Sequence, residues 1–278
     1  MDRDIVTAPV VEVIGYTKPD VIGMNNYLEQ LHPDLNEDHV VSKLLGDMVD
    51  TEESGLINPD EIIEFAGRFC YRSFYKGRET KEYIRNILNE GHGSITEQFD
   101  INFAIAGVSR TLTHELIRHR LISPSQESQR YVDAKDIRLV VPPLMLSKRP
   151  DYWCNYYRTL CDWSRNTYEA VAKEAENDLP DDCTTREKVK RVREAARSVL
   201  PGCAETRLVA KWNMRHMRHL LQMRGSEHAD LEIRRFAVTV FLKYLDVVSN
   251  DSVLLEDFSI QQDARFGIAT VQSERGAV

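Results

Sequence analysis

The segment from Arg118 to Tyr131 holds the densest set of side chains that could bind or polarise a ligand. Arg118 and Arg120 flank His119, and six polar residues follow in succession at 125–130. Arginine offers a planar, permanently charged fork that suits phosphates and the carbonyl edges of heterocycles. A polar run of this length cannot fold alone, so it faces water or holds a ligand. The segment predicts anion binding, and the alternative is a basic helix end followed by a surface loop.

Formal charge is unevenly distributed along the chain. The whole sequence has 36 Lys and Arg against 44 Asp and Glu, and its net charge of −8 argues against a dedicated binder of duplex DNA. Residues 186–235 reverse this balance, with thirteen basic residues against six acidic ones. An acidic chain with one basic stretch is suited to collecting small anions, although i,i+4 pairs on a solvated helix face explain part of that stretch.

An RNA-binding or other anion-binding module without catalysis is the alternative function for this basic stretch. Modules that bind RNA interleave aromatic side chains with basic ones, so that bases can stack on them. Residues 186–235 offer only Trp212, and Phe236 follows just past their end. The composition therefore favours small anionic ligands over a nucleic acid.

Several common cofactor and metal motifs are absent from the sequence. It has no G-x-G-x-x-G and no G-x-x-x-x-G-K-[ST], so a bound nucleotide would not be held by a Rossmann turn or a P-loop. The five cysteines are scattered without any C-x-x-C, which predicts neither disulfides nor a zinc knuckle. His114 and His119 lie about 140° apart around a helix, and His216 with His219 lacks a third ligand nearby, so no metal site is expected.

The basic segment resembles the signature of a known enzyme family. Arg118-His119-Arg120, followed by seven residues and Ser128, resembles the RHR-x7-S motif of the flavin-dependent thymidylate synthases, and SQ-x-SQRY at 125–131 extends the match. Other matching segments keep the family's order over roughly residues 60–250: GHGSITE at 91–97, GVSR and HELIRHR at 107–120, Arg197 before Leu200-Pro201, and Asn213-Met214-Arg215 through Arg224 to His228.

The resemblance implies a reaction and an assembly. The expected reaction is the reductive methylation of dUMP to dTMP, with 5,10-methylenetetrahydrofolate as carbon donor and NADPH as reductant through FAD. The expected assembly is a homotetramer that binds FAD at subunit junctions and shares its active sites between subunits. All of these ligands are anionic, which agrees with the basic stretch at 186–235.

The resemblance also implies roles for individual residues. Those expected to bind dUMP are Glu115, Arg118, Gln126, Glu127, Ser128, Gln129, Arg130, Arg197 and Arg224. Those expected to contact FAD are His92, Ser94, Glu97, Arg118, His119, Arg120, Asn213, Arg215 and His219. Arg224 is the expected catalytic residue, because a cation against N3 of uracil and its neighbouring carbonyl favours the ionised ring and makes C5 a better carbon nucleophile.

Some of these residues have purely local alternatives. Ser94 and Glu97 also have the spacing of a helix capping box. Arg215, His219 and Gln222 lie on one helical face, which could equally be a plain polar face. Many members of the family have asparagine at the position of His219, and some have threonine at that of Ser94, so the flavin contacts are where this chain departs from the family.

The local pattern predicts the elements that position these residues. Helices are expected over about residues 59–71, 80–89, 109–120, 152–177, 184–198, 214–225 and 228–249. Strands are expected over 98–106, 137–141 and 207–212, whereas 121–131 is expected to be a loop. These elements predict an α+β class: a mixed single-domain fold with a largely antiparallel sheet flanked by long helices.

The chain divides into three parts on the same evidence. Residues 1–58 form an N-terminal extension with an acidic loop, 59–262 form the synthase domain, and 263–278 form a tail that is expected to be weakly ordered. Apolar runs such as 103–108 are far too short to cross a membrane. The N-terminus lacks the pattern of a secretory signal, so a cytoplasmic location is expected.

Overall fold

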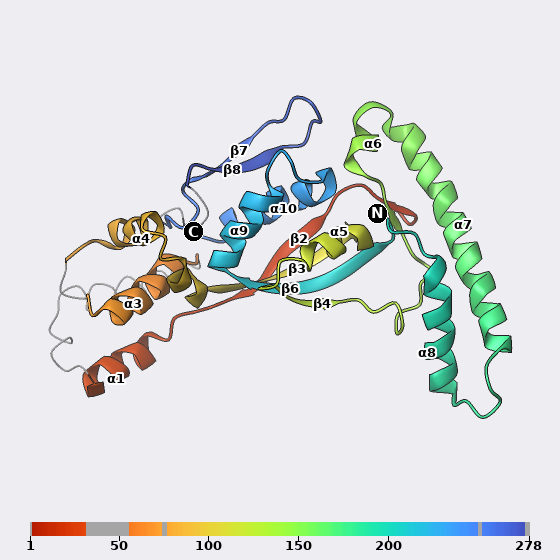
Figure 1. Ribbon diagram of the computed structural model, residues 1–278, viewed down its shortest axis with the longest axis horizontal. Helices are drawn as coiled ribbons and strands as arrows, with labels where there is room; N and C mark the ends of the chain where they lie inside the picture. Colours follow the sequence, from red (N-terminus) through yellow and green to blue (C-terminus); the bar gives the residue numbers. More distant parts are fainter. Residues whose placement is uncertain (1, 32–55, 74–76, 250–251, 276–278) are drawn as a thin grey trace.

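The computed structural model describes residues 2–31, 56–73, 77–249 and 252–275. Its centre is an antiparallel sheet of four strands in the order β2-β3-β6-β4 (Figure 1). The strands are β2 Val10–Tyr16, β3 Asp100–Ser109, β4 Ser123–Gln126 and β6 Glu205–Asn213. The mixed α+β class with an antiparallel sheet is therefore confirmed. The acidic loop expected within residues 1–58 lies largely outside the described residues.

The alternation of side chains on β3 produces the sheet's buried face. Ile101, Phe103 and Ile105 are buried, as the pattern at 98–106 predicts. Phe103 pairs in register with Ala210 of β6, and its ring stacks on Trp212 with 4.7 Å between centroids. This face packs against helices and forms the main core of the molecule.

Gly107 marks an irregularity in β3. The pairing with β6 shifts register between Ile105 and Val108, and Gly107 has a φ of 70°, which other residues rarely adopt. A Cβ atom there would lie 2.6 Å from the carbonyl oxygen of Ala8. Glycine is therefore required where the N-terminal segment crosses this strand.

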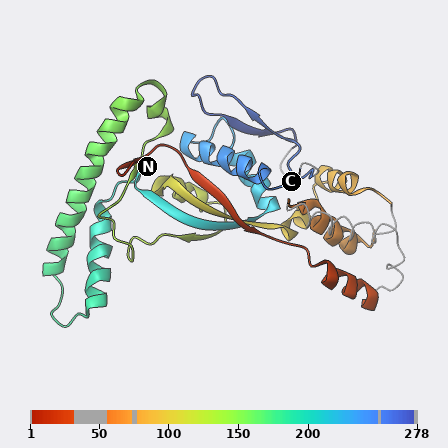
Figure 2. The same ribbon diagram turned by 180° about the vertical axis from the view of Figure 1, so that it is seen from behind.

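The helices form one group over the sheet and one group at each end of it (Figure 1, Figure 2). Those over the buried face are α5 Arg110–Leu116, α9 Met214–Arg224 and α10 Leu231–Leu245. Those at one end are α1 Val21–Leu31, α3 Pro59–Tyr71, α4 Thr80–Asn89 and the 3-10 helix η3 Gly93–Gln98. Those at the other end are α6 Pro143–Lys148, α7 Pro150–Asn177, α8 Thr185–Ala196 and the short η4 Arg197–Val199.

Side-chain caps fix the starts of the helices that carry site residues. The Ser109 side chain accepts a hydrogen bond from the backbone N–H of Leu112 at 2.9 Å, and Thr184 forms a capping box at the start of α8. The Asn213 side chain accepts from the backbone N–H of His216 at 2.9 Å, which joins the end of β6 to the start of α9. The helix starts predicted at 109 and 184 are confirmed.

Two short pairs of strands complete the fold. Strands β1 Ile5–Val6 and β5 Leu139–Val140 run parallel, whereas β7 Phe258–Gln261 and β8 Thr270–Ser273 form an antiparallel hairpin. The N-terminal segment thus contributes β1 and β2, and the segment expected to be a weakly ordered tail contributes β8. Thr270 and Val271 are buried, because pairing with β7 carries them onto the core.

Two local expectations differ from the structure. The segment expected to be a loop at 121–131 contains β4, whose Pro124 is tolerated because the strand lies at the sheet edge. Ser94 and Glu97 do not form a capping box: η3 begins after His92 with no side-chain cap, and Glu97 pairs with Arg215 instead.

A buried ion pair anchors α9 to the C-terminal hairpin. Arg218 donates from Nη1 and Nη2 to the two carboxylate oxygens of Asp257 at 2.8 and 2.9 Å. Both side chains are less than 5% exposed, so the loss of one partner would leave an unpaired buried charge. In the described ranges, no helix has both the length and the apolar character needed to cross a bilayer.

Candidate active site

The predicted site residues lie in three clusters along the sheet. The Arg224 cluster comprises the predicted residues Glu115, His119, His219 and Arg224, and the structure adds His216, which was not predicted. The η3 cluster comprises His92, Ser94, Glu97, Asn213 and Arg215. The loop cluster comprises Gln126, Glu127, Ser128, Gln129, Arg130 and Arg197, and Arg118 and Arg120 lie on the exposed turn after α5.

The Arg224 cluster holds one guanidinium between two anchors. Nε of Arg224 donates to Nε2 of His119 at 2.9 Å, and Nη1 donates to Oε2 of Glu115 at 2.9 Å. Nη2 has no hydrogen-bond partner among the described residues. The guanidinium is therefore fixed on one side and keeps N–H donors for a ligand on the other.

The contact with Arg224 defines the charge state of His119. A guanidinium can only donate, so Nε2 of His119 must carry a lone pair and the imidazole is neutral. Burial, followed by the charges of Arg224 and His219, lowers the pKa of His119 to about 4. Burial also raises the pKa of Glu115, although Arg224 opposes that shift. The site thus holds an imidazole as an acceptor at neutral pH.

Two further histidines surround the His119 ring. His216 lies edge to face with it at 5.7 Å between centroids and 79°, and His219 lies at 5.4 Å and 65°. His216 is only 2% exposed, and burial lowers its pKa to about 4 as well. In contrast, His219 is exposed at the surface. The three imidazoles come from the turn after α5 and from one face of α9.

These two buried histidines predict an acid-sensitive fold. An unfolded chain protonates histidine near pH 6.5, whereas folded His119 and His216 protonate near pH 4, so the unfolded state binds more protons between these values. Their stabilising contribution is complete above pH 6.5 and is lost as the pH falls toward 4. Each histidine should contribute a slope of about 1.4 kcal/mol per pH unit to the free energy of unfolding.

The measurement is urea unfolding at fixed protein concentration between pH 4 and 8, for wild type and His216→Phe. The variant should show a weaker dependence on pH by about one proton between pH 4 and 6.5. Equal slopes for both proteins would show that folded His216 titrates like an exposed histidine.

The η3 cluster lies where β6 ends and α9 begins. Nη1 of Arg215 donates to Oε1 of Glu97 at 2.7 Å, and Nδ1 of His92 lies 3.1 Å from the hydroxyl of Tyr71. Ser94 is exposed beside them. The Arg215 and Glu97 side chains are about two-fifths exposed, at 41% and 38%, so both can exchange their pairing for a ligand.

The loop cluster follows the edge strand β4. Nε2 of Gln126 donates to the hydroxyls of Thr113 and Thr206, both at 3.1 Å, which fixes the end of the strand. Arg130 pairs with Glu194 of α8 at 3.1 Å, and its backbone N–H donates to Oγ of Ser128 at 3.3 Å. A cavity of about 200 Å³ adjoins this loop and is lined by Glu127, Gln129, Arg138, Glu205 and Arg207, among others.

Arg110 is a candidate ligand-binding residue that sequence reasoning missed. It is the first residue of α5, and its Nη1 donates to the carbonyl of Glu127 at 3.5 Å. Burial and then the charge of Arg197 lower the pKa of Arg110. Within the described ranges, neither arginine forms a hydrogen bond or a close ion pair with a carboxylate, although the charge of Glu194 acts on Arg197. A cation at the N-terminus of a helix opposes the helix dipole, and that placement was the signal available in the sequence.

The loop and η3 clusters join the sheet at separate points on one chain. The loop cluster joins β6 at Arg207, whose carbonyl accepts from the backbone N–H of Glu127, whereas the η3 cluster joins it at Asn213. Six residues of strand separate these two points, which corresponds to about 20 Å. No single small ring can contact both clusters on one chain.

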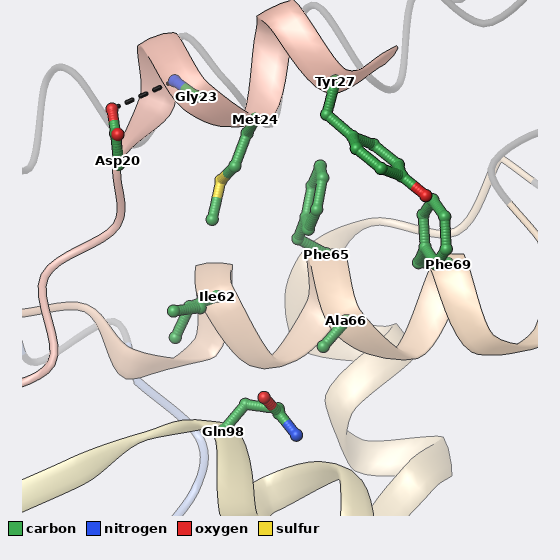
Figure 3. A pocket seen from close by; sticks show the side chains of 9 residues that line it. All are labelled: Asp20, Gly23, Met24, Tyr27, Ile62, Phe65, Ala66, Phe69 and Gln98. Atoms are coloured by element: carbon green, nitrogen blue, oxygen red, sulfur yellow. Dashed lines mark hydrogen bonds between the residues drawn. The ribbon is translucent and has the colours of Figure 1, made fainter. Parts of the chain in front are cut away.

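A larger cavity lies beside α1 and α3, and Gln98 of η3 is among its lining residues. It has a volume of about 570 Å³ and opens between α1 and α3, with Met24, Tyr27, Phe65 and Phe69 on its walls and Gln98 below them (Figure 3). Its other lining residues are Asp20, Gly23, Ile62 and Ala66. None of the residues predicted to bind dUMP or FAD lines it.

The fold and these cationic clusters define a mixed α+β protein that is built to bind anionic ligands. Residues 54–248 match the family described as thymidylate synthase complementing protein. The chain belongs to this family, and the resemblance seen in the RHR segment is confirmed.

Close relatives carry the name flavin-dependent thymidylate synthase. The protein from Mycobacterium avium (strain 104) is 42% identical over 203 residues, which cover 72% of this chain and 79% of the relative. The protein from Mycobacterium tuberculosis (strain ATCC 25618 / H37Rv) is 44% identical over 182 residues, covering 64% and 72%. That from Mycolicibacterium gilvum (strain PYR-GCK) is 40% identical over 203 residues, covering 72% and 79%.

Proposed function

We infer that this chain is a flavin-dependent thymidylate synthase, an enzyme that converts dUMP to dTMP with FAD as its cofactor. Its family and the names of its relatives support this activity. The observation that carries it is the guanidinium of Arg224, held by His119 and Glu115 with N–H donors left free. The carbon donor is 5,10-methylenetetrahydrofolate and the reductant is NADPH. This function is favoured over the alternative of a non-catalytic RNA-binding module.

Arg224 is the catalytic residue of this mechanism. Its free N–H groups stabilise the negative charge that develops on N3 of uracil and the adjacent carbonyl, which makes C5 the nucleophile toward the methylene carbon. The two anchors fix the fork before substrate arrives, so little reorganisation is needed when the charge forms. Neutral His119 contributes by accepting from Nε without adding a second positive charge beside Arg224.

The loop cluster binds the nucleotide phosphate. Arg110 and Arg197 lie close enough to repel each other, and among the described residues neither forms a hydrogen bond or close ion pair with a carboxylate, so a phosphate satisfies both. Arg130 and Ser128 lie on the neighbouring loop and add donors. The other residues of this cluster assigned to dUMP are Gln126, Glu127 and Gln129. Glu115 and Arg118 are assigned to the same nucleotide, and Glu115 belongs to the Arg224 cluster.

The residues present fit FAD. The side chains of Arg118 and Arg120 are exposed and have no acidic partner within the described part of the chain, which suits them to a pyrophosphate. The other residues assigned to FAD are His92, Ser94, Glu97, His119, Asn213, Arg215 and His219. FAD, when bound, supplies the reducing equivalents that convert the transferred methylene group to methyl.

The active site is shared between subunits of a homotetramer. The separation of about 20 Å between the loop and η3 clusters supports this assembly, because each site then draws clusters from different chains. The sheet face away from α5, α9 and α10 also exposes apolar side chains. Val10 is 49% exposed and Val209 is 40% exposed, and their cross-strand partners Ala106 and Ala104 share that face.

The test is the anaerobic visible spectrum of the protein reconstituted with FAD. NADPH should bleach the bound flavin when dUMP is present, and dTMP should form once 5,10-methylenetetrahydrofolate is added. Deoxyuridine, which lacks the phosphate, is the matched control and should support far less bleaching, since Arg110 and Arg197 then have no ligand. Failure to bind FAD would overturn both the activity and the assignment of the η3 cluster.

A further inference from the structure

His216 is a buried polar side chain that the proposed reaction leaves without a role. Its side chain is 2% exposed, and its Nε2 has no hydrogen-bond partner among the described residues. Its neighbours are rings: Trp212 at 6.5 Å between centroids, His119 at 5.7 Å and His219 at 6.4 Å. A buried nitrogen without a partner costs stability, whereas an apolar ring of similar size would not carry that cost.

We propose that His216 is a positioning residue for Arg224 that acts through the His119 ring. This inference rests on the proposed role of Arg224. The contact between Arg224 and His119 requires a lone pair on Nε2 of His119. Two events would remove this acceptor: protonation of the ring, or rotation of the ring toward water. His216 opposes both, because it fills the space beside the ring and keeps water out of it.

The charged and titratable groups around the two rings agree with this role. Arg224 and His219 act on His119, and His119 and His219 act on His216. All of them are cationic or can become so, and none favours the protonated form of either ring. Glu115, the carboxylate of the cluster, is paired with Arg224. Protonation of His119 would therefore place a second positive charge against Arg224 with nothing to neutralise it.

The geometry indicates how His216 acts. Its ring meets His119 edge to face, and its own Nε2 makes no hydrogen bond among the described residues. His216 therefore acts by filling space and excluding water, and it does not transfer a proton. An aromatic ring without nitrogen should therefore replace it. A small side chain should not, because the space that it leaves admits water beside His119.

The experiment compares His216→Ala and His216→Phe with wild type. Histidine labelled with 13C at Cε1 reports the titration of His119 by NMR in the full chain without substrate. Calorimetry reports dUMP binding at pH 8 and pH 6. In His216→Ala, the titration midpoint of His119 should rise from about 4 to near the ordinary histidine value of about 6.5, and the affinity for dUMP should fall about fourfold between pH 8 and pH 6, relative to the change in wild type. In His216→Phe, both properties should match wild type.

Controls separate this role from a general loss of packing. Leu221→Ala opens a cavity on the same helix, about 140° around it from His216, and should lower stability without moving the His119 titration. His216→Ser serves as the second small variant if the alanine variant does not fold.

Two results would overturn the proposal. One is a small variant whose His119 titration and dUMP binding follow the wild-type pH dependence. The other is a loss in His216→Phe equal to that in the small variants, which would indicate that the imidazole nitrogen is needed. Because the titration of His119 is read without substrate, it tests the effect of His216 even if Arg224 has another role in turnover.

Discussion

Arg224→Ala should lower kcat for dTMP formation by about 10³-fold while FAD stays bound. In the proposed mechanism the side chain supplies the donors for the charge that develops on uracil, and removal of such donors lowers kcat by about this factor. None of the residues assigned to FAD depends on Arg224 except His119, which loses a hydrogen bond and keeps its ring contacts with His216 and His219. Stopped assays of dTMP, with the flavin absorbance after gel filtration, measure both effects.

Arg224→Lys is the matched control for charge. Lysine keeps the positive charge but cannot contact His119 and Glu115 while also presenting a planar fork. It should recover only part of the lost rate. If Arg224→Ala formed dTMP at the wild-type rate, Arg224 would have no part in the mechanism.

The double variant Arg110→Ala/Arg197→Ala should weaken dUMP binding by about 10²-fold or more. Each arginine is expected to give a charge-assisted hydrogen bond to the phosphate, and each such bond contributes about 1.5–3 kcal/mol. Burial and mutual repulsion lower the pKa of Arg110, and a dianionic ligand between the two guanidinium groups relieves that repulsion. Calorimetric titration with dUMP gives the affinity directly.

Arg186→Ala is the matched control on α8, because Arg186 is exposed near the start of this helix, whereas Arg197 follows its C-terminal end. It should bind dUMP like wild type. The affinity for deoxyuridine, which lacks a phosphate, should be low in wild type and unchanged in the double variant. An equal loss for the nucleoside and the nucleotide would mean that Arg110 and Arg197 shape the site without contacting the phosphate.

The parts of the fold that local chemistry determines could be predicted from the sequence. Ser109 and Thr184 each start a helix because their hydroxyls accept a backbone N–H, and this signal is contained within four residues. The alternation in β3 likewise identifies its buried face. In contrast, β4 has the sequence Ser-Pro-Ser-Gln, which has no strand preference of its own, and it is extended only because β6 pairs with it.

The candidate site could likewise be predicted only in part from the sequence. The spacing of Arg118, His119, Arg120 and Ser128 was sufficient to predict the family. The contact between Arg224 and His119 joins residues 105 positions apart, and that between Arg224 and Glu115 joins residues 109 positions apart. Such contacts depend on how α5 and α9 pack on the sheet, which spacing alone does not contain.

The position of Arg110 should affect how quickly the protein is degraded in the cell. Arg110 is the first residue of α5, so its positive charge lies at the positive end of a helix and is also repelled by Arg197; both effects lower the stability of the protein without ligand. If the nucleotide binds there as proposed, it stabilises the fold, since it binds the native state and not the unfolded chain. The abundance of this enzyme should then follow the supply of its substrate, because chains without nucleotide unfold and are degraded sooner.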